Sequence, residues 1–289
     1  MSFFRYPGGK NKLKDRICER IMSLSNSCRD CNGEFEYREP FFGGGSIGLA
    51  LMKQDKLTRA WFNDKDEGIA CLWNAVGIYP HELKKMVKGF KPSVKAFDEI
   101  SEFLKTQTLR YTSESVVQYG FYKLAIHQIS YSGLGLKSGG PLGGRSQESA
   151  YKIDCRWSPD YICKKIDEVN KMFRNIDFPG CTSHDFSEVI VDYRPAVIYL
   201  DPPYYDKGSD LYYHSFTEQD HKRLAKELKA TPHKWVLSYD DCPEIRKLYD
   251  WANIEVLNVN YSITSKKVQD AGKRQSRWKQ ELLITAKHE

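Results

Sequence analysis

The sequence predicts an α/β protein, and two observations carry this prediction. Apolar stretches of strand length alternate with periodic stretches of helical length in residues 1–77 and again in residues 175–289. This alternation is typical of parallel strands joined by crossover helices. Residues 78–174 show mainly helical periodicity instead. We therefore expect one Rossmann-like sheet, formed by the two outer segments, which a mostly helical insertion interrupts.

The expected elements follow from local patterns along the chain. Before the insertion, apolar periodicity and turn residues predict a helix near 12–24, a strand at 35–39, a helix at 46–53, a strand at 59–62 and a helix ending near 74. In the insertion we expect helices near 81–88, 95–105, 114–130 and 158–173, and a glycine-rich loop at 132–146. After it we expect strands at 195–200, 234–238, 254–259 and 281–286, and a helix at 218–229.

The composition is that of an ordinary globular protein, with 40% hydrophobic and 28% charged residues in a chain of 289. The net charge of +6 permits a nucleic-acid partner without requiring one. The chain has neither an apolar run of about 18 residues nor a signal-peptide pattern, so we expect a cytoplasmic protein without a membrane span. Of eight cysteines, only Cys28 and Cys31 form a CxxC pair, which favours reduced thiols over a zinc site.

The turn EPFFGGGSIG carries the glycine pattern GxGxxG between a predicted strand and a predicted helix. Gly43, Gly45 and Gly48 can adopt positive φ and let a ligand approach the backbone. Asp64 ends the next strand about twenty residues later, where a carboxylate can accept hydrogen bonds from ribose hydroxyls. Together these residues indicate a site for an adenosine-containing ligand. A tight turn followed by a helix-capping aspartate is the structural alternative.

The turn YLDPPYYD follows a buried strand of the predicted sheet, a position where ligands bind in doubly wound folds. Its two prolines fix the backbone, so the Asp201 carboxylate and the Pro202 carbonyl can accept hydrogen bonds from one amino group. Tyr204 offers a face on which a planar base can stack. For Tyr205, stacking on the base and packing as a core ring are equally good interpretations. Phe216 is more simply a surface-loop residue than part of a loop that closes over the site.

Five motifs occur in one order along the chain: RYPGGK at 5–10, EPFFGGGSIG at 39–48, ND at 63–64, HDF at 184–186 and DPPY at 201–204. In this order they resemble the S-adenosylmethionine-dependent DNA adenine-N6 methyltransferases of the Dam-like class. The insertion, which stands between ND and HDF, has no close match to that class. A tyrosine also stands at position 6, where the class often has an apolar residue or tryptophan.

The resemblance implies a methyltransferase sheet with an inserted target-recognition domain, S-adenosylmethionine as the cofactor, and double-stranded DNA as the substrate. It places Asp64 at the ribose hydroxyls of the cofactor, and Asp185 and Phe186 beside its adenine. The cofactor site it implies consists of Tyr6, Gly8, Gly9, Lys10, Glu39, Pro40, Phe41, Gly43, Gly44, Gly45, Asp64, Asp185, Phe186 and Asp201. The catalytic residues it implies, which hold the target base, are Asp201, Pro202, Pro203 and Tyr204.

The residues of the second turn suit chemistry at an adenine amino group. Two acceptors, from Asp201 and Pro202, would free the nitrogen lone pair for direct attack on a methyl group, and no covalent intermediate is needed. Cytosine-C5 methylation needs a thiolate, usually in a Pro-Cys pair, and this chain has none. Because the amino group of a paired adenine is out of reach, the base must leave the duplex.

Basic residues that could contact DNA phosphates gather in two places. Residues 260–279 contain six Lys or Arg and one Asp, and the insertion contains further basic residues. The candidates for nucleic-acid contacts are Arg110, Lys137, Arg145, Lys266, Lys267, Lys273 and Arg274.

The expected protein is thus an adenine-specific DNA methyltransferase that acts as a monomer, and a cognate restriction nuclease would be a compatible partner. The alternatives are an RNA or protein-glutamine methyltransferase, because related proline turns serve those amino groups, and an inactive DNA-binding relative.

Overall fold

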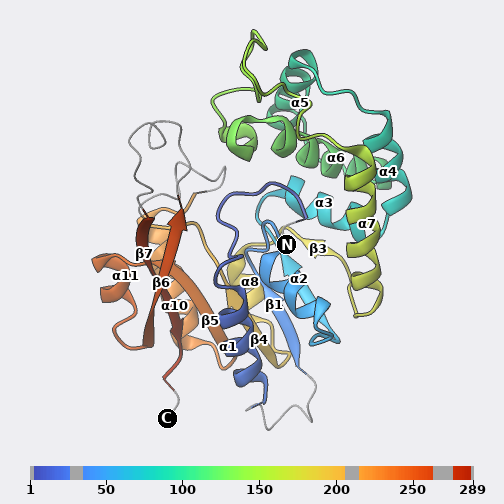
Figure 1. The fold of residues 1–289 in the computed structure, drawn as a ribbon. Coiled ribbons are helices and arrows are strands. Elements are labelled where there is room, and N and C mark those ends of the chain that lie inside the picture. Colours follow the sequence, from blue (N-terminus) through green and yellow to red (C-terminus); the bar gives the residue numbers. More distant parts are fainter. Residues whose placement is uncertain (1–2, 27–34, 206–214, 263–275, 288–289) are drawn as a thin grey trace.

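The computed structural model describes residues 3–26, 35–205, 215–262 and 276–287 (Figure 1). Seven strands form one sheet in the order β3-β2-β1-β4-β5-β7-β6. The strands are β1 (Glu36–Glu39), β2 (Ala60–Asn63), β3 (Cys181–Thr182), β4 (Ala196–Leu200), β5 (Lys234–Asp240), β6 (Asn253–Ser262) and β7 (Ser276–Thr285).

The strand order confirms the predicted Rossmann-like α/β class. Strands β1 to β5 pair in parallel, whereas β7 runs antiparallel to both β5 and β6. From β1 the chain proceeds outward through β2 and β3, and it returns to the other side of β1 with β4. The carboxyl ends of β1 and β4 therefore flank a topological switch point, where such sheets bind ligands.

The predicted helices all form, with ends that differ from the prediction by a few residues. They are α1 (Lys14–Asn26), α2 (Ser46–Lys53), α3 (Glu67–Gly77), α4 (Pro80–Gly89), α5 (Val94–Thr106), α6 (Ser113–Ile129), α7 (Pro159–Arg174) and α10 (Glu218–Ala230). Within the described residues, four short elements escaped prediction besides the two-residue β3: α8 (Phe186–Val191), α11 (Pro243–Leu248), and the 3-10 turns η2 (Tyr131–Gly133) and η3 (Gly135–Lys137).

Apolar side chains cover both faces of the sheet, as a buried parallel sheet requires. In β4, Val197 and Tyr199 join a core with α1, α2 and the inserted helices. Ala196, Ile198 and Leu200 point the other way, into a core with α8, α10 and α11. Helices α4 to α7 form a region beside the sheet in Figure 1, and α3 packs against α6 and α7.

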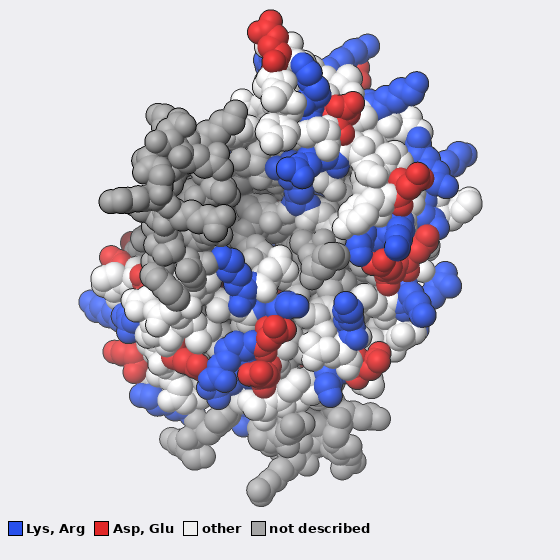
Figure 2. Space-filling view, in the orientation of Figure 1, with Lys and Arg blue, Asp and Glu red and all other residues white. Residues whose placement is uncertain are grey.

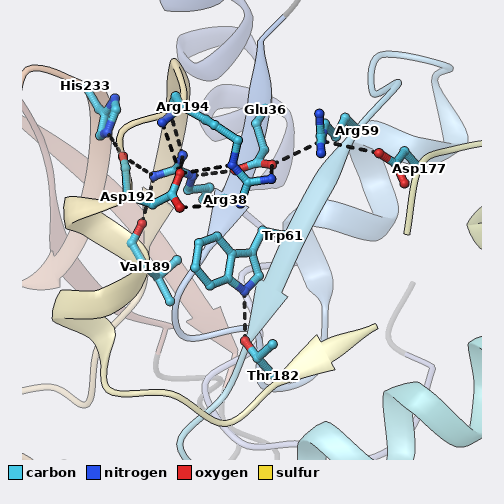
Figure 3. Close-up of polar contacts among 10 residues, drawn as sticks. All are labelled: Glu36, Arg38, Arg59, Trp61, Asp177, Thr182, Val189, Asp192, Arg194 and His233. Atoms are coloured by element: carbon cyan, nitrogen blue, oxygen red, sulfur yellow. Dashed lines mark hydrogen bonds and ion pairs between the residues drawn. The ribbon is translucent and has the colours of Figure 1, made fainter. Parts of the chain in front are cut away.

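A fully buried cation lies on the α8 side of β1 (Figure 3). The Arg38 guanidinium donates five hydrogen bonds: to the Glu36 carboxylate, to the Asp192 carboxylate, and to the carbonyls of Val189, Asp192 and Arg194. A guanidinium has five N–H groups, so every donor is satisfied. The network therefore fastens the connection between α8 and β4 to the sheet.

Candidate active site

A cavity of about 390 Å³ lies at the carboxyl ends of β1, β2 and β4. Its size is within the range of about 300–1,000 Å³ that is usual for small-molecule sites. The structure brings every residue of the predicted cofactor site to this cavity: Tyr6, Gly8, Gly9, Lys10, Glu39, Pro40, Phe41, Gly43, Gly44, Gly45, Asp64, Asp185, Phe186 and Asp201 all line it. Residues from all five motifs therefore meet at the topological switch point.

The glycine turn before α2 forms one wall of the cavity. Gly43 and Gly45 have φ values of 45° and 67°, which lie in the left-handed region. A Cβ atom on Gly43 would lie 2.7 Å from the Tyr6 ring, and one on Gly45 would lie 2.9 Å from Trp73. The Trp73 indole also donates to the Gly43 carbonyl over 2.9 Å. Both the backbone conformation and the packing therefore require glycine here.

Asp64 connects the end of β2 to this turn. One carboxylate oxygen accepts the backbone N–H of Gly43 at 2.7 Å, and the other accepts that of Asp66 at 2.9 Å. Burial, reinforced by the negative charge of Asp66, raises the pKa of Asp64 to about 7. Each carboxylate oxygen keeps acceptor capacity beyond the single bond that it makes.

Asp185 has the opposite electrostatic setting. It caps α8, and both of its oxygens accept hydrogen bonds from Arg223, at 2.7 and 3.0 Å. Burial opposes its ionisation, but the bonds from Arg223 and Ser187 outweigh burial and lower the pKa of Asp185 to about 2. The Arg223 guanidinium also lies 4.2 Å from the centre of the Phe186 ring.

Glu39 lies at the base of the cavity, at the end of β1. It is buried, and its Oε2 atom accepts hydrogen bonds from the Tyr37 hydroxyl at 2.7 Å and the Gly48 N–H at 3.1 Å. Burial raises the pKa of Glu39 well above its ordinary value. A Cβ atom on Gly48 would lie 3.0 Å from this carboxylate, so the third glycine of the pattern leaves room for it.

The DPPY turn places Asp201 against an ammonium group. The Lys10 Nζ atom lies 2.7 and 2.8 Å from the two carboxylate oxygens, and the Ser238 hydroxyl donates to one of them at 2.9 Å. Burial raises the pKa of Asp201, and Lys10 offsets part of that effect. Lys10 therefore lines the cavity as predicted, but its charge is paired with Asp201 of the DPPY turn.

The model of one protein family, the D12 class N6 adenine-specific DNA methyltransferases, matches residues 6–263. The chain belongs to this family. No match was found among curated proteins. The family uses S-adenosylmethionine as methyl donor and methylates adenine in DNA at specific sites after the base has left the helix. The assignment favours DNA over the RNA and protein alternatives, and an enzyme over an inactive relative.

The cavity of this methyltransferase suits S-adenosylmethionine chemically. The cofactor combines a ribose diol, an adenine ring and a positively charged methionine end. The cavity offers a buried carboxylate with spare acceptors in Asp64, aromatic rings in Phe41 and Phe186, and acidic groups in Glu39 and Asp201. These groups have the complementary chemistry for each part.

The two tyrosines of the turn lie in different contacts. The Tyr204 ring centre is 4.7 Å from the Lys10 ammonium, and its hydroxyl donates to the buried Glu281 at 2.8 Å. Tyr205 packs with its ring centre 5.0 Å from that of His221, which agrees with a packed ring. Phe216 lines the cavity, so it is more than the surface-loop residue that we expected.

Of the predicted nucleic-acid contacts, three lie in described residues. Arg110 and Lys137 are exposed, and Arg145 is exposed but makes a bidentate ion pair with Asp98 at 2.9 and 3.0 Å. Lys266, Lys267, Lys273 and Arg274 lie outside the described residues, as do Cys28 and Cys31. Figure 2 shows lysine and arginine side chains above and below a hollow near the centre of one face.

Sequence reasoning missed several residues that touch the site. Arg223, Ser238 and Glu281 engage Asp185, Asp201 and Tyr204, respectively. They belong to no motif, and only the packing of α10, β5 and β7 brings them to these partners. His127 of α6 is a packed histidine: it is buried and has its Nδ1 atom 2.8 Å from the Gly133 carbonyl oxygen.

In the described parts of the chain, no three His, Cys, Asp or Glu side chains gather so that they could hold a metal ion. None of the described helices is both long and apolar enough to cross a membrane.

Proposed function

We propose that this methyltransferase holds the amino group of the extruded adenine between the Asp201 carboxylate and the Pro202 carbonyl. One observation carries the proposal: the Asp201 carboxylate already binds a nitrogen donor, the Lys10 ammonium, at 2.7 Å in the cavity that the glycine turn lines. An adenine amino group is also a nitrogen donor of hydrogen bonds. Once the base enters, this amino group can bind the Asp201 carboxylate, provided that the Lys10 ammonium moves away or shares the carboxylate with it.

The roles of the cofactor residues are part of the same proposal. Asp64 would accept the ribose hydroxyls, because each of its oxygens makes only one backbone hydrogen bond. Phe186 and Phe41, whose ring centres lie 5.8 Å apart, would bound the adenine. Glu39 would face the cationic methionine end, since a nearby positive charge favours the ionised form of a buried carboxylate.

The chemistry of the step requires little beyond positioning. S-adenosylmethionine, when bound, supplies an electrophilic methyl group on a sulfonium sulfur. The amino nitrogen gains the bond to that carbon as the carbon–sulfur bond breaks, and it then releases one proton. Asp201 would accept a hydrogen bond from the N–H group before the methyl transfer and the released proton afterwards. Burial raises the pKa of Asp201 and so makes it a better proton acceptor.

The target-recognition role belongs to residues 78–174 in this proposal, with Arg110, Lys137 and Arg145 among the groups available to DNA. The exposure of these side chains supports phosphate contacts, and the Arg145 pair with Asp98 would open or rearrange there. The DNA substrate favours a cytoplasmic site of action. Action as a monomer and the presence of a partner nuclease stay predictions.

Substitution of Asp201 tests the proposal most directly. With labelled S-adenosylmethionine and duplex DNA, Asp201→Ala should lower the transfer of label to adenine N6 by at least about 10³-fold, because both the acceptor and its charge are lost. Affinity for S-adenosylhomocysteine, measured by calorimetry, should change much less. Asp201→Asn keeps one acceptor oxygen and should retain more activity than Asp201→Ala.

The matched control is Asp250→Ala, which removes an exposed aspartate between α11 and β6. It should transfer methyl groups at the wild-type rate. An Asp201→Ala enzyme with ordinary turnover would remove Asp201 from the proposed role. A variant that has lost cofactor affinity to the same degree as turnover would assign Asp201 to cofactor binding instead.

A further inference from the structure

Helix α6 of the insertion lies directly against α3 of the cofactor-binding part. The contact is close because α6 has a glycine at position 120. A Cβ atom there would lie 2.7 Å from the Cys71 carbonyl oxygen and 2.8 Å from the Leu72 Cα atom. The backbones of the two helices therefore approach each other without an intervening side chain. This approach brings the next turn of α6 over the start of α3.

Lys123 occupies that next turn and makes a buried ion pair. Its ammonium binds the carboxylate of Asp66, and the two side chains are only 6% and 16% exposed. The aliphatic part of Lys123 passes over Gly68, where a Cβ atom would lie 3.0 Å from the Lys123 Cδ atom. A buried ammonium is costly unless it is paired, so the burial of Lys123 depends on its pair with Asp66.

Asp66 connects this pair to the cofactor cavity. It is the N-cap residue of α3, with its carboxylate accepting the Gly68 and Ile69 N–H groups. Its own N–H binds Asp64, whose other oxygen holds the Gly43 N–H of the glycine turn. Lys123 thus lies at the end of a short chain of contacts that leads from the insertion to the glycine turn.

The charges around Asp64 oppose each other. Asp66 on the same loop and Glu39 at the end of β1 are acidic, and Cys181 in β3 is a buried thiol. Burial and the charge of Asp66 favour the protonated form of Asp64, whereas Lys123 favours the ionised form. Among the described groups named here that affect the pKa of Asp64, Lys123 is thus the cation, and it belongs to the insertion.

We propose that Lys123 is a positioning residue of the cofactor site, which acts through Asp66 to keep Asp64 ionised and oriented toward the ribose of S-adenosylmethionine. This inference rests on the proposed role of Asp64. It gives the insertion a part in cofactor binding besides target recognition. Removal of the Lys123 charge should therefore weaken cofactor binding, and by more at low pH than at high pH.

The sign follows from the ionisation of Asp64. Its pKa is about 7, and loss of the cation raises it further. A rise of about one pH unit is the upper limit here, because Lys123 contacts Asp66 and not Asp64, and it would lower the ionised fraction at pH 7 from about a half to about a tenth. S-adenosylhomocysteine should then bind more weakly at pH 7, by up to about five-fold, and less than about two-fold more weakly at pH 8.5.

The experiment is calorimetric titration of S-adenosylhomocysteine into the full-length protein at pH 7 and pH 8.5, without DNA. Lys123→Met should show the pH-dependent loss, and Lys123→Arg, which keeps the charge, should bind within about two-fold of the wild type. In the Lys123→Met, Asp66→Asn double variant both charges are gone, so the pH profile should return toward that of the wild type. Asparagine keeps the helix cap.

Lys84→Met is the matched control, because Lys84 pairs with Asp167 between two inserted helices. It should bind like the wild type at both pH values. The inference is overturned if Lys123→Met weakens S-adenosylhomocysteine binding by the same factor at pH 7 and at pH 8.5. Such a loss would reflect a folding defect, which does not depend on the ionisation of Asp64. Asp64→Asn separates the two proposals: undiminished binding there would refute the ribose role itself, whereas weak binding there with an unaltered Lys123→Met profile would refute only the role of Lys123.

Discussion

Arg38 and Glu39 are neighbours in β1, yet their side chains enter contrasting environments on opposite faces of the sheet. Arg38 donates all five of its hydrogen bonds to fixed acceptors of the protein. One of these acceptors, Asp192, has a lowered pKa, because Arg194, Arg38 and a backbone N–H outweigh its burial. The cluster behind the sheet is therefore electrostatically complete without a ligand.

The carboxylates on the cavity side are not compensated to the same degree. Burial raises the pKa of Glu39, Asp64 and Asp201 above their ordinary values, despite the hydrogen bonds that each accepts. A cofactor with a cationic methionine end and a base with an amino group can supply what these carboxylates lack. The comparison indicates that buried charge stabilises the fold on the α8 side of the sheet. On the cavity side we expect it to serve ligand binding.

The largest effect on stability is expected from Arg38→Met. Removing the cation leaves Glu36 and Asp192 without their buried partner, which typically costs about 3–5 kcal/mol of the free energy of unfolding. Urea denaturation followed by circular dichroism measures this change. Arg59→Met is the control, because Arg59 also pairs with Glu36 but is 49% exposed. It should cost less than about 1 kcal/mol, and equal losses in the two variants would remove the distinction between buried and exposed partners of Glu36.

The next largest effect is expected from Lys10→Met, on the cavity side. Loss of the ammonium removes the group that offsets burial at Asp201, so the pKa of that carboxyl rises further. In the proposed role Asp201 must be ionised, so turnover should fall, with a larger loss at pH 7 than at pH 8.5, where more of the carboxyl is ionised. Rates of methyl transfer to DNA across this pH range measure the shift.

Lys12→Met is the control for this variant, because Lys12 is an exposed lysine two residues away. It should follow the wild-type pH profile. If Lys10→Met is as active as the wild type at both pH values, the ammonium only fills the place of an absent amino group and does not tune Asp201.

Much of the site could be predicted because its motifs end strands of one parallel sheet. Glu39 is the last residue of β1, Asp64 and Asp201 each follow a strand, and the carboxyl ends of parallel strands meet at one edge. The partners of these residues could not be predicted in the same way. Lys10 lies 191 residues from Asp201, and Lys123 lies 57 residues from Asp66. Many lysines could form such pairs, and only the packed fold selects one of them.

The short elements were missed for a related reason. Strand β3 has two residues and α8 has six, too few for a period of two or 3.6 to be recognised. The HDF motif predicted a binding residue at Asp185, but the pair of Asp185 with Arg223 depends on α10, which no local pattern connects to it.

The smallest effect is expected from Arg223→Met, and it compares two ion pairs at the same cavity. The pair of Arg223 with Asp185 is 41% and 32% exposed, whereas that of Lys123 with Asp66 is 6% and 16% exposed. Without Arg223 the pKa of Asp185 moves up from about 2 toward its ordinary value near 4. Asp185 thus stays ionised at every pH between 6 and 8.5. Affinity for S-adenosylhomocysteine should fall by less than about three-fold, with the pH profile of the wild type. The opposite outcome is a pH-dependent loss of affinity in Arg223→Met like the one expected for Lys123→Met. In that case the exposure of an ion pair does not decide whether it controls ligand binding, and the contrast between buried and exposed charge fails at this site.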